Sequence, residues 1–152
     1  MHLFSIRLAT LADLATVAVL FDAYRQFYEQ APDLDLATRY VGARLQNRES
    51  VILLAADECQ QGVGFCQLYP SFCSVEAQPI YTLYDLFVLP AARRSGIGKQ
   101  LLLAAERHAA ETGAARMDLT TARNNGPAQA AYEALGWVRD DVFLAYSKHI
   151  KT

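Results

Sequence analysis

A basic turn with two glycines joins an apolar strand segment to a helical segment within residues 84–106. The apolar run stops at Pro90, two arginines and the tripeptide Gly96, Ile97, Gly98 follow, and a helical pattern begins at once. The first N–H groups of a helix have no partner inside it, and the helix dipole places roughly half a positive charge there. Glycines let a phosphate approach the backbone closely. The stretch therefore predicts a phosphate or pyrophosphate site, with a glycine-rich helix start that binds nothing as the alternative.

Two common nucleotide loops are excluded by the spacing. A Walker loop needs a glycine five residues before its Gly-Lys pair and a Ser or Thr after it, but Arg93 and Gln100 occupy those positions. A dinucleotide fingerprint needs a third glycine where Leu101 stands, and it normally follows the first strand of its domain. The pattern that remains is Arg-x-x-Gly-x-Gly over residues 93–98.

The length and composition predict a globular chain. Its 152 residues predict a single domain over residues 1–152 with one buried core, and 53% apolar with 20% charged residues excludes a disordered chain. The net charge of −2 gives no indication of nucleic-acid binding. No apolar run reaches the roughly 18 residues of a membrane span, and no secretory signal is visible. We therefore expect a cytoplasmic protein with neither nucleic acid nor membrane as a partner.

The cysteines give no sign of a metal centre. Cys59, Cys66 and Cys73 are odd in number and lack metal-ligand spacing with any histidine. We interpret them as reduced thiols, with a metal or redox role as the alternative, and expect no metal site.

Hydrophobic periodicity and turn signals predict the element order β-α-α-β-β-β-α-β-α-β. Thr10 is expected to cap the first helix, with Asp13 in the capping-box position. Residues 73–79 are expected to form a loop. The order indicates a mixed sheet with helices on its faces. The expected strands cover residues 4–8, 51–56, 63–68, 80–89, 117–121 and 142–146, and the expected helices follow Thr10, cover 33–46 and 97–112, and follow Asn125.

A second motif, NGPAQAAYEALGW, lies further along the chain at Asn125–Trp137. Together with Arg-x-x-Gly-x-Gly it resembles the GNAT family of N-acetyltransferases, whose pattern places Asn, Ala, Tyr and Gly-aromatic at this spacing. The matching positions are Asn125, Ala128, Tyr132, Gly136 and Trp137, the last in place of a more usual Phe. The resemblance implies an α+β, three-layer α/β/α domain with a mixed, mostly antiparallel sheet of about six to seven strands and about four helices. It covers residues 80–146 well and the first half only by element order.

The resemblance also implies acetyl-CoA as the cofactor. In this family the strand before the glycine turn carries a bulge and separates from the next strand, and acetyl-CoA lies in the gap. Backbone groups near Phe87 would hold the pantetheine arm, and N–H groups of the turn would hold the pyrophosphate. The implied cofactor contacts are Leu86, Phe87, Val88, Arg93, Arg94, Ser95, Gly96, Ile97, Gly98, Lys99, Asn125 and Tyr132.

Acetyl transfer to an amine requires two proton movements. An alkylamine with pKa near 10.4 is neutral in only about one molecule in 2,500 at pH 7, so a base has leverage, and the departing thiolate needs an acid. Tyr132 occupies the family's general-acid position, with a packing role as the alternative. Asp85 is the candidate base, and a carboxylate paired with an arginine is its alternative. Glu76, in the preceding loop, is a further candidate.

The acceptor is less well specified than the cofactor. Tyr24, Phe27, Tyr28, Glu29, Tyr69 and Glu76 are candidates to line a site for a cationic amine, and a buried core with a solvated acidic face is the alternative. The sequence pattern DLFV-P-x-x-R resembles that of the branch that acts on polyamines and related small amines. We therefore expect direct attack of a small primary amine on acetyl-CoA in a ternary complex. Protein or histone lysines, or a CoA-binding module without turnover, are the rival functions. The resemblance to this branch also implies a homodimer through residues 142–146, with an ordinary edge strand as the alternative.

Overall fold

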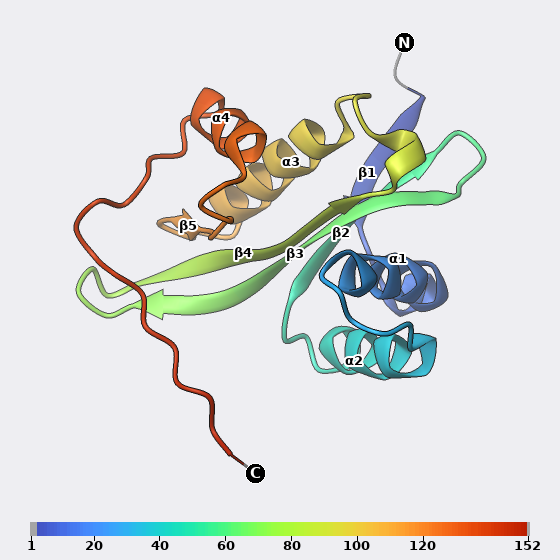
Figure 1. The fold of residues 1–152 in the computed structure, drawn as a ribbon, viewed down its shortest axis with the longest axis horizontal. Coiled ribbons are helices and arrows are strands. Elements are labelled where there is room, and N and C mark those ends of the chain that lie inside the picture. Colours follow the sequence, from blue (N-terminus) through green and yellow to red (C-terminus); the bar gives the residue numbers. More distant parts are fainter. Residues whose placement is uncertain (1–2, 152) are drawn as a thin grey trace. The chain divides into compact units, whose positions relative to one another are not determined.

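A computed structural model describes residues 3–151. The chain divides into two compact units, Met1–Thr120 and Thr121–Thr152. The first unit contains a five-stranded sheet in the order β1-β2-β3-β4-β5 (Figure 1). The pairs are antiparallel except for the parallel pair β4–β5, so the predicted mixed, mostly antiparallel α+β class is confirmed. The strands are Phe4–Leu8 (β1), Val51–Asp57 (β2), Gly62–Cys73 (β3), Gln78–Val88 (β4) and Met117–Asp118 (β5).

Helices cover both faces of this sheet, as the three-layer prediction requires. Helices α1 (Leu14–Phe27) and α2 (Leu34–Gln46) lie on one face, and α3 (Ile97–Glu111) lies on the other (Figure 1). Side chains alternate accordingly along β3, because strand neighbours point to opposite faces. Phe65 packs in the core cluster with residues of α1, whereas the adjacent Cys66 thiol contacts the Leu101 carbonyl of α3.

A capping box starts the first helical segment, as predicted. Thr10 precedes a 3-10 turn, Leu11–Asp13, and its N–H donates to the Asp13 carboxylate at 2.8 Å. Arg7 of β1 binds the same carboxylate through both terminal nitrogens at 2.7 and 2.8 Å. The hydrogen bond from Arg7 is the main cause that lowers the pKa of Asp13 to about 2. This cluster therefore fixes the start of α1 against the first strand.

Strand β3 is longer than predicted. It continues past Leu68 to Cys73 and pairs with β4 throughout, so the expected loop over residues 73–79 shrinks to a tight turn. Pro70 suggested an end, because proline removes a donor from the ladder. Pairing with β2 ends at Leu68, so this edge of β3 has no neighbour at Pro70 and the missing N–H breaks no bond.

Strand β4 carries the irregularity that shapes the site. Its register with β3 shifts between the pairs Gln67–Asp85 and Leu68–Leu83, which leaves Tyr84 as an extra, bulged residue. Its parallel pairing with β5 involves only Tyr81 and Thr82. Beyond the bulge, β4 therefore continues to Val88 without a paired strand on the β5 side among residues 3–151.

The second unit contains α4 (Gly126–Ala134), capped by Asn125 and followed by Gly136 at φ 92°, as predicted. The final strand expected over residues 142–146 does not form, so the predicted count of six to seven strands is wrong by at least one. The carboxylate of Asp140 accepts the N–H groups of Val142 and Phe143, which turns the backbone locally. Alternating side chains predict a strand only where another strand supplies hydrogen-bond partners.

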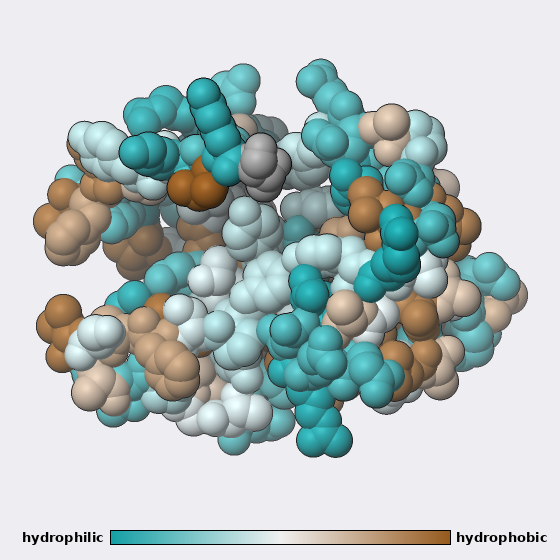
Figure 2. Space-filling view, turned by 90° about the horizontal axis from the view of Figure 1, so that it is seen from below, coloured by the Kyte–Doolittle hydropathy of each residue, from teal (hydrophilic) through white to brown (hydrophobic). Residues whose placement is uncertain are grey.

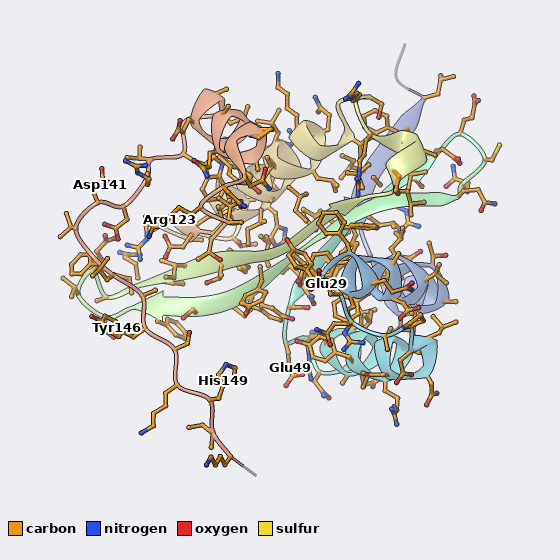
Figure 3. The ribbon with its side chains drawn as sticks, in the orientation of Figure 1. Glu29, Glu49, Arg123, Asp141, Tyr146 and His149 are labelled. Carbon is orange, nitrogen blue, oxygen red and sulfur yellow. The ribbon has the colours of Figure 1, made fainter. Side chains whose placement is uncertain are left out.

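Apolar side chains also reach the surface. On the face in Figure 2, hydrophobic residues are interspersed with hydrophilic ones. Tyr146, on the extended segment of the second unit (Figure 3), is 91% exposed. Among residues 3–151, no helix combines the length and apolar character needed to cross a bilayer.

Candidate functional site

The end of β4 offers backbone groups that no strand occupies. The sheet pairing with β5 stops at Thr82, and the strand continues through Asp85, Leu86, Phe87 and Val88. Phe87 is buried in the core, whereas Leu86 and Val88 are half-buried. The predicted bulge is thus present, and the pairing with β5 stops before it because β5 ends at Asp118, short of the expected residue 121. An elongated ligand with amide groups can pair with such an edge as a further strand would.

The glycine turn lies directly at the N-terminus of α3. Gly96 is the N-cap residue at φ 85°, and Arg94 also has a positive φ of 65°. The first helical bond runs from the Gln100 N–H to the Gly96 carbonyl, so the N–H groups of Ile97, Gly98 and Lys99 precede it. This arrangement suits a pyrophosphate, because it combines three N–H groups with the helix dipole. The exposed side chains of Arg94 and Lys99 add positive charge.

Arg93 has a structural contact that the motif alone did not indicate. Its Nε donates to the Val88 carbonyl at 2.9 Å, and its guanidinium lies 5.5 Å from the Phe27 ring and 5.7 Å from the Phe87 ring. The side chain thereby ties the turn to the end of β4 and to α1. The Nε–H of Arg93 is therefore engaged within the protein.

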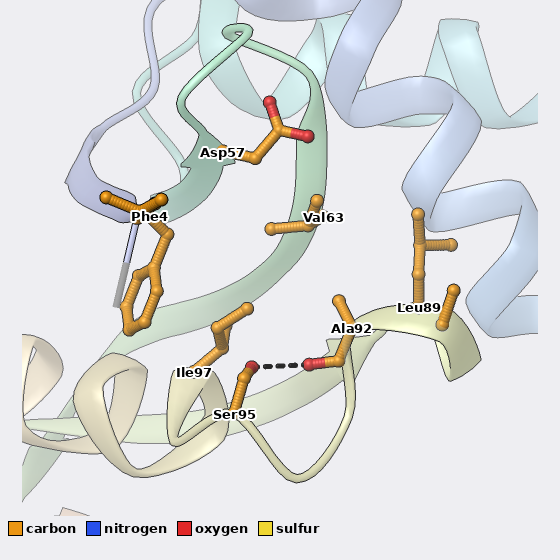
Figure 4. A pocket seen from close by; sticks show the side chains of 9 residues that line it. Phe4, Asp57, Val63, Leu89, Ala92, Ser95 and Ile97 are labelled. Carbon is orange, nitrogen blue, oxygen red and sulfur yellow. Dashed lines mark hydrogen bonds between the residues drawn. The ribbon is translucent and has the colours of Figure 1, made fainter. Parts of the chain in front are cut away.

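A cavity of 340 Å³ lies beside this turn (Figure 4). It is bordered by β1, the end of β2, the start of β3 and the segment from the end of β4 to the start of α3. The Ser95 hydroxyl in its lining donates to the Ala92 carbonyl. Ser95 and Ile97 are the predicted cofactor residues in its lining. The lining is mostly apolar, and the candidate base Asp85 is not part of it.

Asp85 lies on the α1 side of β4 and is 4% exposed. Its Oδ2 accepts from the Gln67 amide nitrogen at 2.7 Å. The Tyr24 hydroxyl donates to the Tyr84 carbonyl at 3.5 Å and lies near the carboxyl. Burial raises the pKa of Asp85 above its usual value, and the Gln67 hydrogen bond and the nearby Tyr24 hydroxyl partly offset this rise. Among the described residues it forms no ion pair, so the alternative of an arginine-paired carboxylate finds no support.

Aromatic side chains gather beside this carboxyl. The Tyr24 ring lies 5.2 Å from that of Tyr28, and Phe27 lies 5.3 Å from Tyr28. Tyr69 of β3 lies 5.5 Å from the ring of the bulged Tyr84. Burial, followed by the Asp85 charge, raises the pKa of Tyr24, which therefore stays protonated. Four of the six predicted acceptor residues thus lie in one region with Asp85.

The two predicted acidic acceptor residues lie outside that region, Glu29 at its border and Glu76 far from it. Glu29 follows the end of α1 at φ 65° and is exposed (Figure 3). Glu76 lies in the turn between β3 and β4, where it pairs with Arg116 at 3.5 Å. About seven strand residues separate it from Asp85, a distance of roughly 20 Å along β4. Glu76 and Asp85 are therefore not brought together.

Asn125 and Tyr132 lie in the second unit. The Asn125 side chain accepts from the Ala128 N–H at 3.3 Å, so it caps α4. Tyr132 is half-buried on α4, and its ring lies 6.1 Å from that of Trp137. The spacing of this motif thus has a local structural basis, since it combines a cap, a helix and the aromatic residue that follows Gly136.

Two residues of the first unit were missed by the sequence reasoning. Tyr40 of α2 shares a 2.6 Å hydrogen bond between hydroxyls with Tyr69, and Gln67 binds Asp85. A single amide within the apolar run of β3 was a detectable signal for Gln67, whereas nothing marked Tyr40.

Cys66 is buried, and burial raises the pKa of its thiol to about 12, so it is unreactive. Among residues 3–151, no three His, Cys, Asp or Glu side chains are grouped to hold a metal.

Comparisons with known proteins give a consistent result. Residues 16–137 match the model of the "Acetyltransferase (GNAT) family". The chain is 45% identical over 146 residues to the "Uncharacterized N-acetyltransferase YhfO" of Bacillus subtilis (strain 168), covering 96% of this chain and 97% of the relative. A crystal structure of a "probable acetyltransferase" superposes with a TM-score of 0.91 at 39% identity, covering 97% and 99% of the two chains. An aminoglycoside N-acetyltransferase, AAC(6')-Iy in complex with CoA, shares the fold with a TM-score of 0.80 at 22% identity, covering 97% and 95%.

Proposed function

The chain belongs to the acetyltransferase (GNAT) family, and we propose that it transfers an acetyl group from acetyl-CoA to a primary amine of a small molecule. The unpaired end of β4, which runs directly into the glycine turn and the α3 N-terminus, supports this proposal most strongly. Attack of the amine takes place directly on the bound thioester, in a complex with both substrates.

The residues present fit acetyl-CoA. When bound, the cofactor supplies an acyl group activated as a thioester. The backbone of Leu86, Phe87 and Val88 would hold its pantetheine arm, because this stretch has no β5 partner. The Val88 carbonyl also accepts from Arg93 Nε at 2.9 Å. The N–H groups from Arg94 to Lys99 would hold the pyrophosphate, where Gly96 presents no side chain to an approaching phosphate.

Asp85 and Tyr132 would move the two protons. A pKa raised by burial makes Asp85 a better base near neutral pH than an ordinary carboxylate, which would bind the proton too weakly. Since Asp85 is 4% exposed, the amine proton would reach it through a water molecule or the Tyr24 hydroxyl. Tyr132 would protonate the departing sulfur, a role assigned from the family motif.

The aromatic region beside Asp85 favours a cationic small-molecule acceptor. Tyrosine and phenylalanine faces attract ammonium groups, and Phe27, Tyr28 and Tyr84 are largely exposed there. Aminoglycosides, after which one structural neighbour is named, are polyamines of this kind. A polyamine-like acceptor is therefore our proposal, with Tyr24, Phe27, Tyr28 and Tyr69 as its contacts.

The test is an acceptor panel. The purified protein is incubated with acetyl-CoA and, separately, spermidine, kanamycin and a lysine-containing peptide, while free thiol and the acceptor mass are followed. We expect acceptor-dependent thiol release and an added acetyl group with the small polyamines. If only the peptide is acetylated, the acceptor is a protein or peptide lysine and not a small polyamine. Binding of CoA without acceptor-dependent release from any amine would instead identify a binding module and overturn the proposal.

Three further predictions accompany this function. A single folding domain over residues 1–152 would unfold in one cooperative transition. A cytoplasmic location would be visible by cell fractionation.

A homodimer through residues 142–146 would be lost on substituting Phe143 and Leu144 with serine, as light scattering would detect.

A further inference from the structure

Gln67 and Asp85 are the buried polar side chains of residues 3–151, and they bind each other. Gln67 is 0% exposed, and the two residues are register partners on β3 and β4, directly beside the bulge at Tyr84. An amide buried in an apolar strand costs free energy unless its hydrogen bonds are made. A polar pair at this position therefore requires an explanation beyond packing.

A short hydrogen-bond chain fixes the orientation of the Gln67 amide. The Ser50 hydroxyl donates to Gln67 Oε1 at 2.7 Å, and Gln67 Nε2 donates to Asp85 Oδ2 at 2.7 Å. A flipped amide would place its oxygen against the carboxylate and its NH₂ group against Ser50. Because the ionised carboxylate can only accept, it selects the arrangement in which Asp85 receives an N–H, and the Ser50 hydroxyl then donates to the remaining Oε1 and holds the amide in place.

The other groups that face Asp85 are neutral. Tyr24 approaches from α1 and Tyr69 lies on β3, and both have pKa values raised above their usual ranges, chiefly by burial. The Cys66 thiol points to the opposite face of the sheet, toward α3. No described cation pairs with the carboxylate. Among the described residues, Gln67 is therefore the side chain that donates directly to the carboxylate, and the nearby Tyr24 hydroxyl also favours its charged form.

We propose that Gln67 is a positioning residue, which orients the Asp85 carboxylate for proton removal and is itself oriented by Ser50. This inference rests on the proposed role of Asp85 as the base. One carboxylate oxygen, Oδ2, is occupied by Gln67, and this contact holds the carboxyl in one rotamer. Loss of the Gln67 donor leaves the charged form of Asp85 less stable, so a higher pH is needed to ionise it.

The test compares Gln67→Met, which keeps the shape but removes the donor, with Ser50→Ala and the conservative Ser50→Thr. The activity of each variant is measured from pH 5 to pH 9 on one amine and expressed as a ratio to the wild type, because the titration of the acceptor amine cancels in this ratio. The carboxyl carbon of Asp85 is titrated in parallel by NMR. Thermal unfolding identifies any variant that does not fold.

We expect the Gln67→Met ratio of kcat/KM to fall toward low pH, by about tenfold on the acid side, since hydrogen bonds to charged groups are of this size. The Asp85 titration moves to higher pH in parallel. Ser50→Ala moves both in the same direction by less, and Ser50→Thr follows the wild type. A flat activity ratio for Gln67→Met with an unmoved Asp85 titration would overturn the inference. If Gln67→Met does not fold, equal pH profiles and equal Asp85 titrations for Ser50→Ala and Ser50→Thr would overturn it instead.

Asp85→Asn separates this inference from the proposed function. An inactive Asp85→Asn variant together with wild-type behaviour of the Gln67 and Ser50 variants rejects the positioning role alone. Full activity of Asp85→Asn rejects Asp85 as the base, and the positioning role with it, while acetyl transfer by the wild type still stands on the acceptor panel.

Discussion

Tyr132 and Asp85 perform complementary proton transfers in the proposed reaction, but their local settings differ. Asp85 is buried with donors on its carboxyl, whereas Tyr132 is half-buried on α4 near Trp137. A phenol O–H on Tyr132 can give its proton to a departing thiolate. The role of each residue can therefore be tested by removing one atom or one charge.

We expect Tyr132→Phe to lower kcat by about 10²-fold at saturating acetyl-CoA and amine, because the variant keeps the ring but has no proton to donate. Binding of CoA, measured by calorimetry, should be unchanged. Tyr146→Phe is the matched control, since Tyr146 lies in the same unit and is almost fully exposed. Equal turnover of the wild type and Tyr132→Phe would remove Tyr132 from the chemistry.

Helix α3 has a positive-φ glycine next to each end, and only one of the two belongs to the proposed site. Gly96 caps the N-terminus at φ 85°, and Gly113 follows the C-terminus at φ 83°. An alanine at either position has a similar backbone cost, about 1–2 kcal/mol. The pair therefore separates helix stability from ligand binding.

We expect Gly96→Ala and Gly113→Ala to lower the free energy of unfolding by similar amounts, about 1–2 kcal/mol. Only Gly96→Ala should weaken CoA binding, because its methyl group lies where the pyrophosphate approaches the helix N-terminus. Denaturant unfolding and calorimetric titration with CoA check the two effects. Equal affinities in the two variants would place the anion elsewhere.

The segment that begins α1 has a pH-dependent stability of its own. The folded-state pKa of Asp13, about 2, lies below the unfolded value of 3.8. The ion pair with Arg7 therefore stabilises the fold above about pH 4, and this contribution disappears as the pH falls toward 2. Because Arg7 is half-exposed, water screens part of the interaction.

We expect Asp13→Asn to lower the free energy of unfolding by about 1–2 kcal/mol at pH 7, with a difference that vanishes near pH 2. Urea unfolding at a series of pH values measures this. Asp35→Asn is the control, since its i,i+4 pair with Arg39 is exposed and 3.7 Å long, so its loss should change little. A constant Asp13→Asn difference at all pH values would refute the ion-pair explanation.

At the scale of the whole chain, the sequence predicted local features better than pairings. Caps such as Thr10 and Asn125 and the glycine that starts α3 were predicted correctly, because each depends on a few neighbouring residues. The extension of β3 past Pro70 and the absence of a strand at residues 142–146 were not, because both depend on which strand lies alongside. The Gln67–Asp85 contact likewise depends on register, which a bulge shifts.

The central claim is that residues 84–99 bind the cofactor, and an NMR titration tests it most directly. The ¹⁵N-labelled protein is titrated with CoA, and the backbone amide signals are followed. We expect the largest changes at residues 85–88 and 94–99, since the unpaired β4 end and the α3 N-terminus supply the contacts. Saturable binding that leaves both segments unmoved and shifts other parts of the chain would contradict the claim.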